Sequence, residues 1–391
     1  HSESMNRPVN IGLSPNLEAD DVSLALKVLL TGGERDAKTQ LVKWFEDYFP
    51  GFEAIPFNSG RSAEWAIIKA LGLKSDDEVL YQDFTCVAVP NSVAWAGATA
   101  VNVATQPSTL NMDPDDLKRK ITPRSRAVII QHTFGQAADI QAIGKICSEK
   151  RIVLIEDCAH ALGAISNGQK LGTFGQVAFF SLGRDKVVSS VFGGVVITSD
   201  AKLAKKLCQI ERDLPENSWT WVAQQLLHPI LTWAILPFYD SGIGKLGLVV
   251  AQKTHLLSKA VYETEKQGGQ PGCFPAKYSP KLATLGLHQL HKLARFNQHC
   301  QEIVAIYFAE LAGTDLVLPP RQEGGIYLRF TVTHPRAREL YLRAKAEKKW
   351  MLGDWYKSPL SVINLPTYPS FTHAQAKLLC DQLKIWLKPK K

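Results

Sequence analysis

Several patterns are missing from this chain, and each absence removes a class of protein. The seven cysteines are odd in number and widely spaced, with no CxxC pair, which argues against a zinc ribbon or a disulfide framework and favours reduced thiols in a cytoplasmic compartment. Lysine and arginine do not form runs interleaved with aromatic residues, so a nucleic-acid groove is not expected. We find no signal peptide and predict no metal site.

What is present is typical of a large globular protein. The 391 residues can bury one large core or two smaller ones, and 45% hydrophobic with 21% charged residues is an ordinary balance. The formal net charge of +8 favours anionic partners such as phosphorylated cofactors, nucleotides or an acidic membrane surface, without choosing among them.

Short apolar runs alternate with amphipathic stretches through the first half of the chain. The expected helices are 17–30, 37–49, 87–96, 114–121 and 140–150, and the expected strands are 78–81, 100–103, 127–131, 152–155 and 177–180. This rhythm predicts the α/β class, with a mostly parallel sheet wrapped by helices. Ligands of such sheets gather at the carboxyl ends of the strands.

The last third of the chain shows a separate α+β pattern. We expect one long amphipathic helix at 280–311, strands at 326–332 and 350–352, and helices at 335–348 and 372–387. A boundary near Gly313 would leave residues 5–312 as a large domain and residues 313–391 as a small one.

The turn Ser59-Gly60-Arg61-Ser62 follows an apolar segment and opens a helical stretch. Backbone N–H groups at a helix start suit a phosphate, and Arg61 would add a charge-assisted hydrogen bond. A plain helix cap is an equally good interpretation of this turn.

Two further groups of polar residues follow buried strands. Asp157 and His160 come after 152–155, where an acid is either a helix cap or a functional carboxylate and a histidine is either structural or functional. Lys186 comes after 177–180, where a low dielectric would make its amine a usable nucleophile. A solvated loop lysine is the alternative.

Residues 219–250 contain three tryptophans and a broken apolar run, 226–238, that is interrupted by two prolines. The uninterrupted part is too short to span a membrane. We interpret the segment either as a buried arm of a dimer or as an aromatic-rich surface that lies on a membrane or grips a lipid tail.

The order of these sites and the sequences around them resemble the DegT/StrS-type sugar aminotransferases, a branch of the fold-type I pyridoxal phosphate (PLP) enzymes. The resemblance covers nearly all of the chain. The motifs that carry it are Asn58-Ser59-Gly60, Gly97-Ala98-Thr99, Leu110-Asn111-Met112-Asp113, Ile121-Thr122-Pro123-Arg124, His132-Thr133-Phe134-Gly135-Gln136, Ala138-Asp139, Glu156-Asp157, Ala159-His160, Gly172-Thr173-Phe174-Gly175, Gly193-Gly194 and Leu365-Pro366-Thr367-Tyr368-Pro369.

This resemblance implies a large, mostly parallel αβα sandwich domain, a smaller C-terminal α+β domain, PLP as cofactor and a homodimer with active sites at the interface. Lys186 falls at the position of the family's lysine, which holds PLP as a Schiff base and then moves the proton between substrate and cofactor. Asp157 would pair with the pyridine nitrogen, and His160 would lie near the phenolic oxygen. The implied cofactor-binding residues are Ser59, Gly60, Arg61, Ser62, Cys86, Asp157, His160, Ser181, Lys186 and Lys277.

The chain departs from the family in four places, one of which is Val187-Val188 after the lysine, where the family usually has Asn-Leu. Cys86 stands where the family usually has an aromatic residue that stacks on the ring. Pro275-Ala276-Lys277-Tyr278 replaces an Asn-Tyr-Arg-Met motif that reaches into the neighbouring subunit's site, although Lys277 keeps the charge of the arginine. The region of about 214–274, with its tryptophan-rich stretch, is longer than in the family.

The function implied is transfer of an amino group from L-glutamate to a nucleotide-linked keto sugar, in amino-sugar or surface-polysaccharide biosynthesis. The family's 3-dehydratases are disfavoured because they have histidine in place of the lysine. Two alternatives stay open: the same chemistry on a lipid-linked acceptor at the inner face of the membrane, and a PLP- or sugar-binding regulatory protein without turnover. Residues 354–356 lie where family members often approach the substrate.

Overall fold

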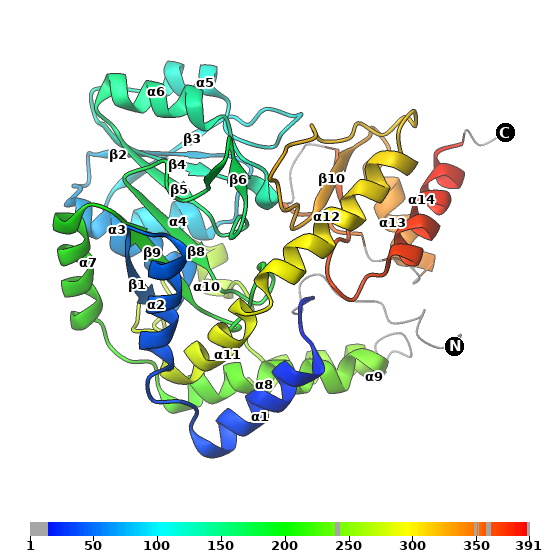
Figure 1. Ribbon diagram of the computed structural model, residues 1–391, viewed down its shortest axis with the longest axis horizontal. Helices are drawn as coiled ribbons and strands as arrows, with labels where there is room; N and C mark the ends of the chain where they lie inside the picture. Colours follow the sequence, from blue (N-terminus) through cyan, green and yellow to red (C-terminus); the bar gives the residue numbers. More distant parts are fainter. Residues whose placement is uncertain (1–14, 239–242, 348–349, 351, 357–360, 389–391) are drawn as a thin grey trace.

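A seven-stranded sheet forms the centre of the larger part of the molecule (Figure 1). The computed structural model describes residues 15–238, 243–347, 350, 352–356 and 361–388. The strand order is β1 (Glu53–Phe57), β9 (Gly194–Thr198), β8 (Val177–Ser181), β5 (Val153–Asp157), β4 (Ser125–Gln131), β2 (Glu78–Gln82) and β3 (Thr99–Val103). Only β9 runs against its neighbours, so the prediction of a mostly parallel α/β sheet is confirmed.

Helices cover both faces of this sheet, which explains why its strands are nearly continuous apolar runs. Successive residues of β4 point to opposite faces: Ile129 joins the cluster under α3 (Gly60–Leu71), α4 (Ala88–Trp95) and α7 (Ala201–Asp213). Ile130 joins the cluster under α5 (Pro114–Lys120) and α6 (Ile140–Lys150). The predicted helices are found within a few residues of their expected limits, whereas α7 and β9 were not anticipated.

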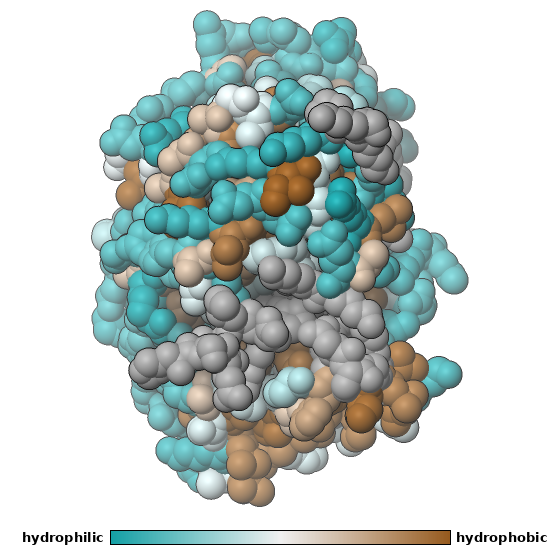
Figure 2. Space-filling view, turned by 90° about the vertical axis from the view of Figure 1, so that its right-hand side faces the viewer, coloured by the Kyte–Doolittle hydropathy of each residue, from teal (hydrophilic) through white to brown (hydrophobic). Residues whose placement is uncertain are grey.

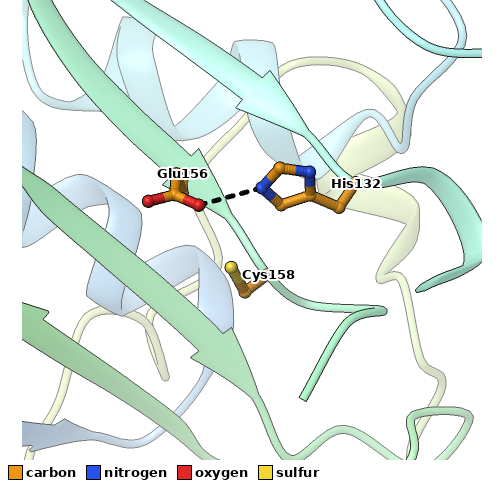
Figure 3. A group of neighbouring side chains, drawn as sticks. All are labelled: His132, Glu156 and Cys158. Carbon is orange, nitrogen blue, oxygen red and sulfur yellow. Dashed lines mark hydrogen bonds and ion pairs between the residues drawn. The ribbon is translucent and has the colours of Figure 1, made fainter. Parts of the chain in front are cut away.

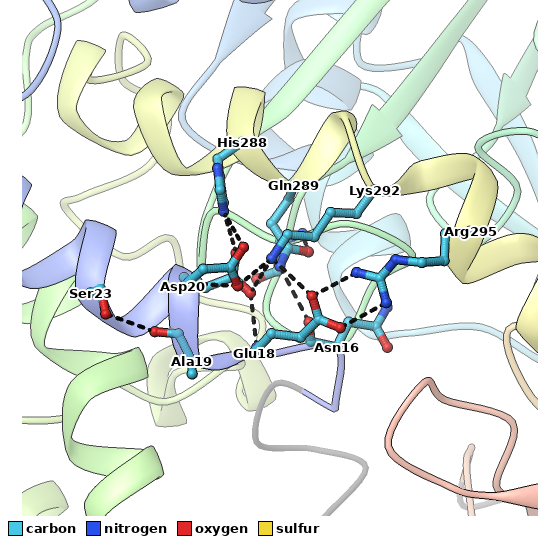
Figure 4. Close-up of polar contacts among 11 residues, drawn as sticks. Asn16, Glu18, Ala19, Asp20, Ser23, His288, Gln289, Lys292 and Arg295 are labelled. Atoms are coloured by element: carbon cyan, nitrogen blue, oxygen red, sulfur yellow. Dashed lines mark hydrogen bonds and ion pairs between the residues drawn. The ribbon is translucent and has the colours of Figure 1, made fainter.

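The predicted long helix at 280–311 is wrong in one respect, because it consists of α11 (Pro280–Leu290) and α12 (Leu293–Glu310). At the break, the ammonium group of Lys292 lies 3.0 Å from Glu18 and 2.7 Å from Asp20, at the start of α1 (Ala19–Thr31) (Figure 4). Arg295, one turn into α12, binds Glu18 with both of its terminal nitrogens. We attribute the break to this charge cluster, which turns Lys292 toward α1 and ties the two segments together.

The C-terminal part has its own small core. β10 (Phe330–Thr333) pairs antiparallel with β11 (Val362–Leu365), and α13 (Ala337–Glu347) and α14 (His373–Leu387) pack beside them. The expected strand at 326–332 starts later than predicted, Trp350 and Leu352 lie outside any strand, and Met351 and Lys348 fall outside the described residues. This core includes the C-terminal half of α12. The division of the chain near residue 313 stays a prediction.

The tryptophan-rich region forms α8 (Trp219–Ile235), a short 3-10 turn (Leu236–Phe238), α9 (Ile243–Lys253) and α10 (Glu263–Lys266). Of these helices, α8 and α9 lie below the sheet in Figure 1, and α8 packs against α1. The helix α2 (Ala37–Tyr48) packs against α11 and β1. A two-residue hairpin, β6 (Ile165–Ser166) and β7 (Gln169–Lys170), completes the strands. Among the helices of the described residues, none has both the length and the apolar character that crossing a membrane requires.

Candidate active site

The predicted residues meet at the carboxyl ends of two neighbouring strands. Asp157 ends β5 and Ser181 ends β8, and the N-terminus of α3 lies against the end of β8. One pocket at this place is lined by eight of the ten predicted residues, namely Ser59, Gly60, Arg61, Cys86, Asp157, His160, Ser181 and Lys186. Ser62 lies buried just behind the turn, and Lys277 is not among the described residues that line this pocket.

The start of α3 is shaped by short contacts. Ser59 caps the helix, since its Oγ accepts a hydrogen bond from the Ser62 amide at 3.2 Å. Gly60 touches the end of β8 so closely that a Cβ there would lie 2.9 Å from the Cβ of Ser181. The sequence could not choose between a helix cap and an anion site; the structure shows the cap, and it also points the first turn of α3 into the pocket.

Lys186 and His160 are direct neighbours in the pocket. The amine of Lys186 lies 3.1 Å from Nε2 of His160, and the Phe134 amide donates to Nδ1 of the same ring at 3.4 Å. Burial, together with the charges of Lys186 and Arg329, holds the pKa of His160 well below its ordinary value, so the ring is neutral. The two ring nitrogens of His160 therefore face the Phe134 amide and the Lys186 amine.

Two carboxyl groups near Lys186 have pKa values shifted in opposite directions. Burial raises the pKa of Asp157 to about 6, although the Ala159 amide at 2.9 Å and the charges of Lys186 and His132 oppose this shift. For Asp185 the burial cost is outweighed by Lys186 and Arg329, which lower its pKa well below the usual range. Asp185 is therefore a fixed anion, whereas Asp157 is an acid whose ionisation calls for a cationic partner.

The backbone after Lys186 is held by residues far away in sequence. The Asn16 side-chain amide donates to the carbonyl groups of Lys186 at 3.1 Å and Val187 at 2.5 Å. Gln289 of α11 in turn donates to the Asn16 carbonyl at 3.2 Å and accepts from the Ser189 amide at 3.3 Å (Figure 4). The charge cluster at the start of α1 thus lies next to the loop that presents Lys186.

The region 214–274 contributes directly to the pocket, which the sequence did not suggest. Ala260 and Val261 line it, and Glu265 forms an ion pair with Arg61. The Ala260 carbonyl also accepts from Arg61 at 2.8 Å, so both ends of this guanidinium are engaged. That Arg61 also contacts a phosphate stays a prediction.

Arg184 is held in the same manner, because its guanidinium donates to the backbone carbonyl and to the hydroxyl of Ser258, both at 2.7 Å. The ring of Phe192 lies near both arginines, 5.1 Å from the Arg184 guanidinium and 5.9 Å from that of Arg61. The ring of Phe274 lies 4.8 Å from the Arg61 guanidinium. No local pattern marks Ser258 or Glu265, since their partners lie more than 70 residues away in the chain.

A buried group of His132, Glu156 and Cys158 lies beside the pocket (Figure 3). Glu156 accepts from His132 at 3.0 Å and from three amides of the 172–175 loop at 2.7 to 2.8 Å. Burial raises the pKa of Cys158 well above its ordinary value, so the sulfur stays a protonated thiol. Since the carboxylate is already saturated with donors, this group organises the loop and does not offer a metal site.

Other residues in the pocket were not singled out as site residues by the sequence. Trp355 and Tyr356 line it, as expected for their segment, and the Tyr356 hydroxyl lies 3.4 Å from Nε2 of His160. Glu64, one turn after Gly60, also faces the pocket and is buried. Its place in a helix after the Ser59 turn was visible in the sequence, but nothing local distinguished it from a solvated glutamate.

Comparisons with known proteins match this chain to one family of aminotransferases. Residues 20–215 match the model of the DegT/DnrJ/EryC1/StrS aminotransferase family. GDP-perosamine synthase of Vibrio cholerae is 33% identical over 376 residues, which span 95% of this chain and 97% of that protein. L-Glutamine:2-deoxy-scyllo-inosose aminotransferase of Streptomyces kanamyceticus is 35% identical over 181 residues, but the match spans only 46% of this chain and 42% of that protein.

Among solved structures, NtdA of Bacillus subtilis with its bound cofactor PMP superposes with a TM-score of 0.72 at 19% identity. The superposition covers 97% of this chain and 85% of that chain. At this identity the likeness establishes the fold, that of the fold-type I PLP-dependent aminotransferases, and leaves the substrate open.

Proposed function

The chain belongs to the DegT/DnrJ/EryC1/StrS aminotransferase family, and from this premise we propose that it transfers an amino group from L-glutamate to a keto sugar carried on a nucleotide. The observation that carries the proposal is Lys186, whose amine lies 3.1 Å from a neutral His160 and shares a pocket with Asp157. The name GDP-perosamine synthase, given to the relative that matches over nearly its whole length, supports a nucleotide-linked acceptor. Amino-sugar or surface-polysaccharide biosynthesis is the setting we propose.

The pocket fits PLP, the cofactor of this family. Asp157 is a buried carboxyl with a raised pKa, as expected of a group that awaits the protonated ring nitrogen. The N-terminus of α3 offers backbone N–H groups to a phosphate, beside the hydroxyl of Ser181. When bound, PLP supplies an electron sink for the carbon that loses its proton.

The residues of this chain then have separable tasks. Lys186 holds the cofactor and, when free, moves a proton with its amine. Asp157 keeps the proton on the ring nitrogen. We assign His160 to the phenolic oxygen side and Ser59, Gly60, Arg61, Ser62 and Ser181 to the phosphate. Cys86 lines the pocket where a stacking ring would lie, and burial raises the pKa of its thiol, so a neutral sulfur would contact the ring.

The direct test is turnover with a panel of GDP- and dTDP-linked keto sugars, with L-glutamate as donor and mass spectrometry of the products. The proposal predicts equal amounts of 2-oxoglutarate and amino sugar, and Lys186→Ala should lower the rate by about 10² to 10⁴. If PLP binds but no acceptor in the panel is aminated, the regulatory-protein alternative takes its place.

We also propose a homodimer in the cytoplasm in which Lys277 serves the neighbouring subunit's pocket. Lys277 is half-buried and lies in a bridge with Phe57, away from the described residues that line its own pocket. A lysine placed there can act on a cofactor only if it faces another chain.

We also propose that residues 219–250 contact the inner face of the membrane peripherally. The exposed apolar side of α9 supports this proposal. Ile243, Leu246 and Val250 are 69%, 66% and 49% exposed and recur at helical spacing, so they share one side of α9. In Figure 2, apolar side chains gather at the lower end of the molecule, the level of α8 and α9 in Figure 1.

Co-sedimentation with anionic liposomes tests this contact. We expect the wild-type chain to pellet with vesicles and the double variant Leu246→Gln, Val250→Gln to stay in the supernatant. Ile385→Gln, at an equally exposed position on α14, should behave like the wild type. A wild-type chain that stays wholly in the supernatant would remove the membrane proposal and leave the dimer arm as the use of this surface.

A further inference from the structure

Glu64 is a buried carboxyl that the tasks assigned above do not use. Its side chain lines the pocket, the residue is 1% exposed, and its Oε1 has no hydrogen-bond partner among the described residues. An unsatisfied carboxyl oxygen in such a place costs free energy, so its retention calls for a ligand or a second proton-binding group.

Glu64 and Asp157 line the same pocket. Gly60 of α3 lies against Ser181 at the end of β8, and Glu64, four residues later, lies on that same side of the helix. Asp157 ends β5, the strand paired with β8 through Asp157 and Phe179. The two carboxyl groups therefore enter one pocket from a helix and from the adjoining strand.

We propose that Glu64 is a positioning residue that shares one proton with Asp157, so that the two carboxyl groups carry a single negative charge at the ring-nitrogen end of the pocket. The inference rests on the proposed function for its purpose, but not for its test. Glu64 holds the proton and Asp157 holds the charge, which keeps Asp157 anionic toward the ring while the second carboxyl adds no repulsion.

The surroundings of Glu64 support this assignment. Burial and the charge of Asp157 raise its pKa well above the ordinary value, and Cys86, from the loop after β2, acts in the same direction. The Ser92 hydroxyl of α4 and the Arg61 guanidinium oppose the shift. Arg61 cannot neutralise Glu64 fully, because Glu265 and the Ala260 carbonyl already hold its guanidinium.

The pH dependence of unfolding of this chain, measured without cofactor, tests the proposal without any turnover. The pKa of Glu64 is higher in the folded chain than in the unfolded chain, so between these two pKa values the native state keeps a proton that the unfolded state has lost. The stabilisation from Glu64 is therefore complete below the unfolded pKa and disappears as pH rises toward the folded pKa. Relative to Glu64→Gln, the unfolding equilibrium constant of the wild type should rise by up to about tenfold per pH unit within that window. The exposed control Glu149→Gln should follow the wild type.

A double-mutant cycle that combines Glu64→Gln with Asp157→Asn tests whether the two carboxyl groups share the proton. Removing the charge of Asp157 should lower the folded pKa of Glu64, so the window should end at a lower pH in that background. The proposal would be overturned if the unfolding equilibrium constants of wild type and Glu64→Gln changed in parallel with pH. It would also be overturned if Asp157→Asn left the pH window of the Glu64 effect unchanged.

A second readout is cofactor affinity by absorbance titration. Glu64→Gln, which keeps a donor, should bind PLP within about threefold of the wild type, whereas Glu64→Leu should bind it at least about tenfold more weakly. Equal losses of PLP affinity in both variants would also contradict the proposal, because a protonated Glu64 acts as a hydrogen-bond donor that only Glu64→Gln retains. Because the unfolding series needs neither cofactor nor substrate, a chain that proves unable to transaminate would still answer it.

Discussion

At the scale of the residue, the pocket depends on buried charges whose partners are fixed. Glu156 is the clearest case, since four donors hold a carboxylate that has no exposed surface. We expect Glu156→Gln to lower the free energy of unfolding by about 3 kcal/mol or more, because an amide loses the charge-assisted hydrogen bonds and brings donors of its own against those amides. Urea denaturation measures this, and Glu149→Gln, on the exposed side of α6, should change little. A change within the error of that control would mean that the 172–175 loop holds without Glu156.

Eight of the ten predicted cofactor-binding residues line the pocket. Asp157, His160, Ser181 and Lys186 follow strands, and strand ends are readable from apolar runs, so their meeting at one edge could be foreseen. The role of Glu64 could not, because a glutamate in a helix is normally solvated. Its burial follows only from the contact between α3 and β8, which is a tertiary property.

At the scale of the element, the 258–265 segment acts as a clamp on the two pocket arginines. Ser258→Ala removes one of the two hydrogen bonds to the Arg184 guanidinium, so we expect PLP to bind roughly threefold to tenfold more weakly, as one charge-assisted bond is worth about 1.5 kcal/mol. Absorbance titration measures the affinity. Ser23→Ala, whose hydroxyl bonds only within exposed α1, should bind like the wild type. Unchanged affinity in Ser258→Ala would leave the segment a covering loop without influence on the site.

The elements themselves were largely predictable, and the exceptions share a cause. Helices with caps and amphipathic faces, such as α3, α6 and α14, were located within a few residues. The division of the predicted 280–311 helix at Lys292 was not, because the acids that receive this lysine lie more than 270 residues earlier. In the tryptophan-rich region, Pro229 interrupts the apolar run, yet α8 continues through this proline and packs on α1.

At the scale of the whole molecule, the proposed dimer makes each pocket dependent on two chains. We expect the chain to elute in size-exclusion chromatography with light scattering at twice its mass of 43.3 kDa. Lys186→Ala and Lys277→Ala should each be impaired, and a mixture of the two after subunit exchange should regain activity. In the mixed dimer, one pocket has Lys186 from one chain and Lys277 from the other. A mixture that stays as inactive as its components would place both lysines in the same chain's pocket.

The central claim is that Lys186 holds PLP in a pocket that accepts an amino group, and the absorbance spectrum of the purified chain with PLP, before and after L-glutamate, tests it most directly. The account predicts a visible band of lysine-bound cofactor that L-glutamate bleaches in the wild type and that Lys186→Ala never shows. A band that L-glutamate leaves unchanged would contradict the donor, and a wild-type spectrum identical to that of Lys186→Ala would contradict the account as a whole.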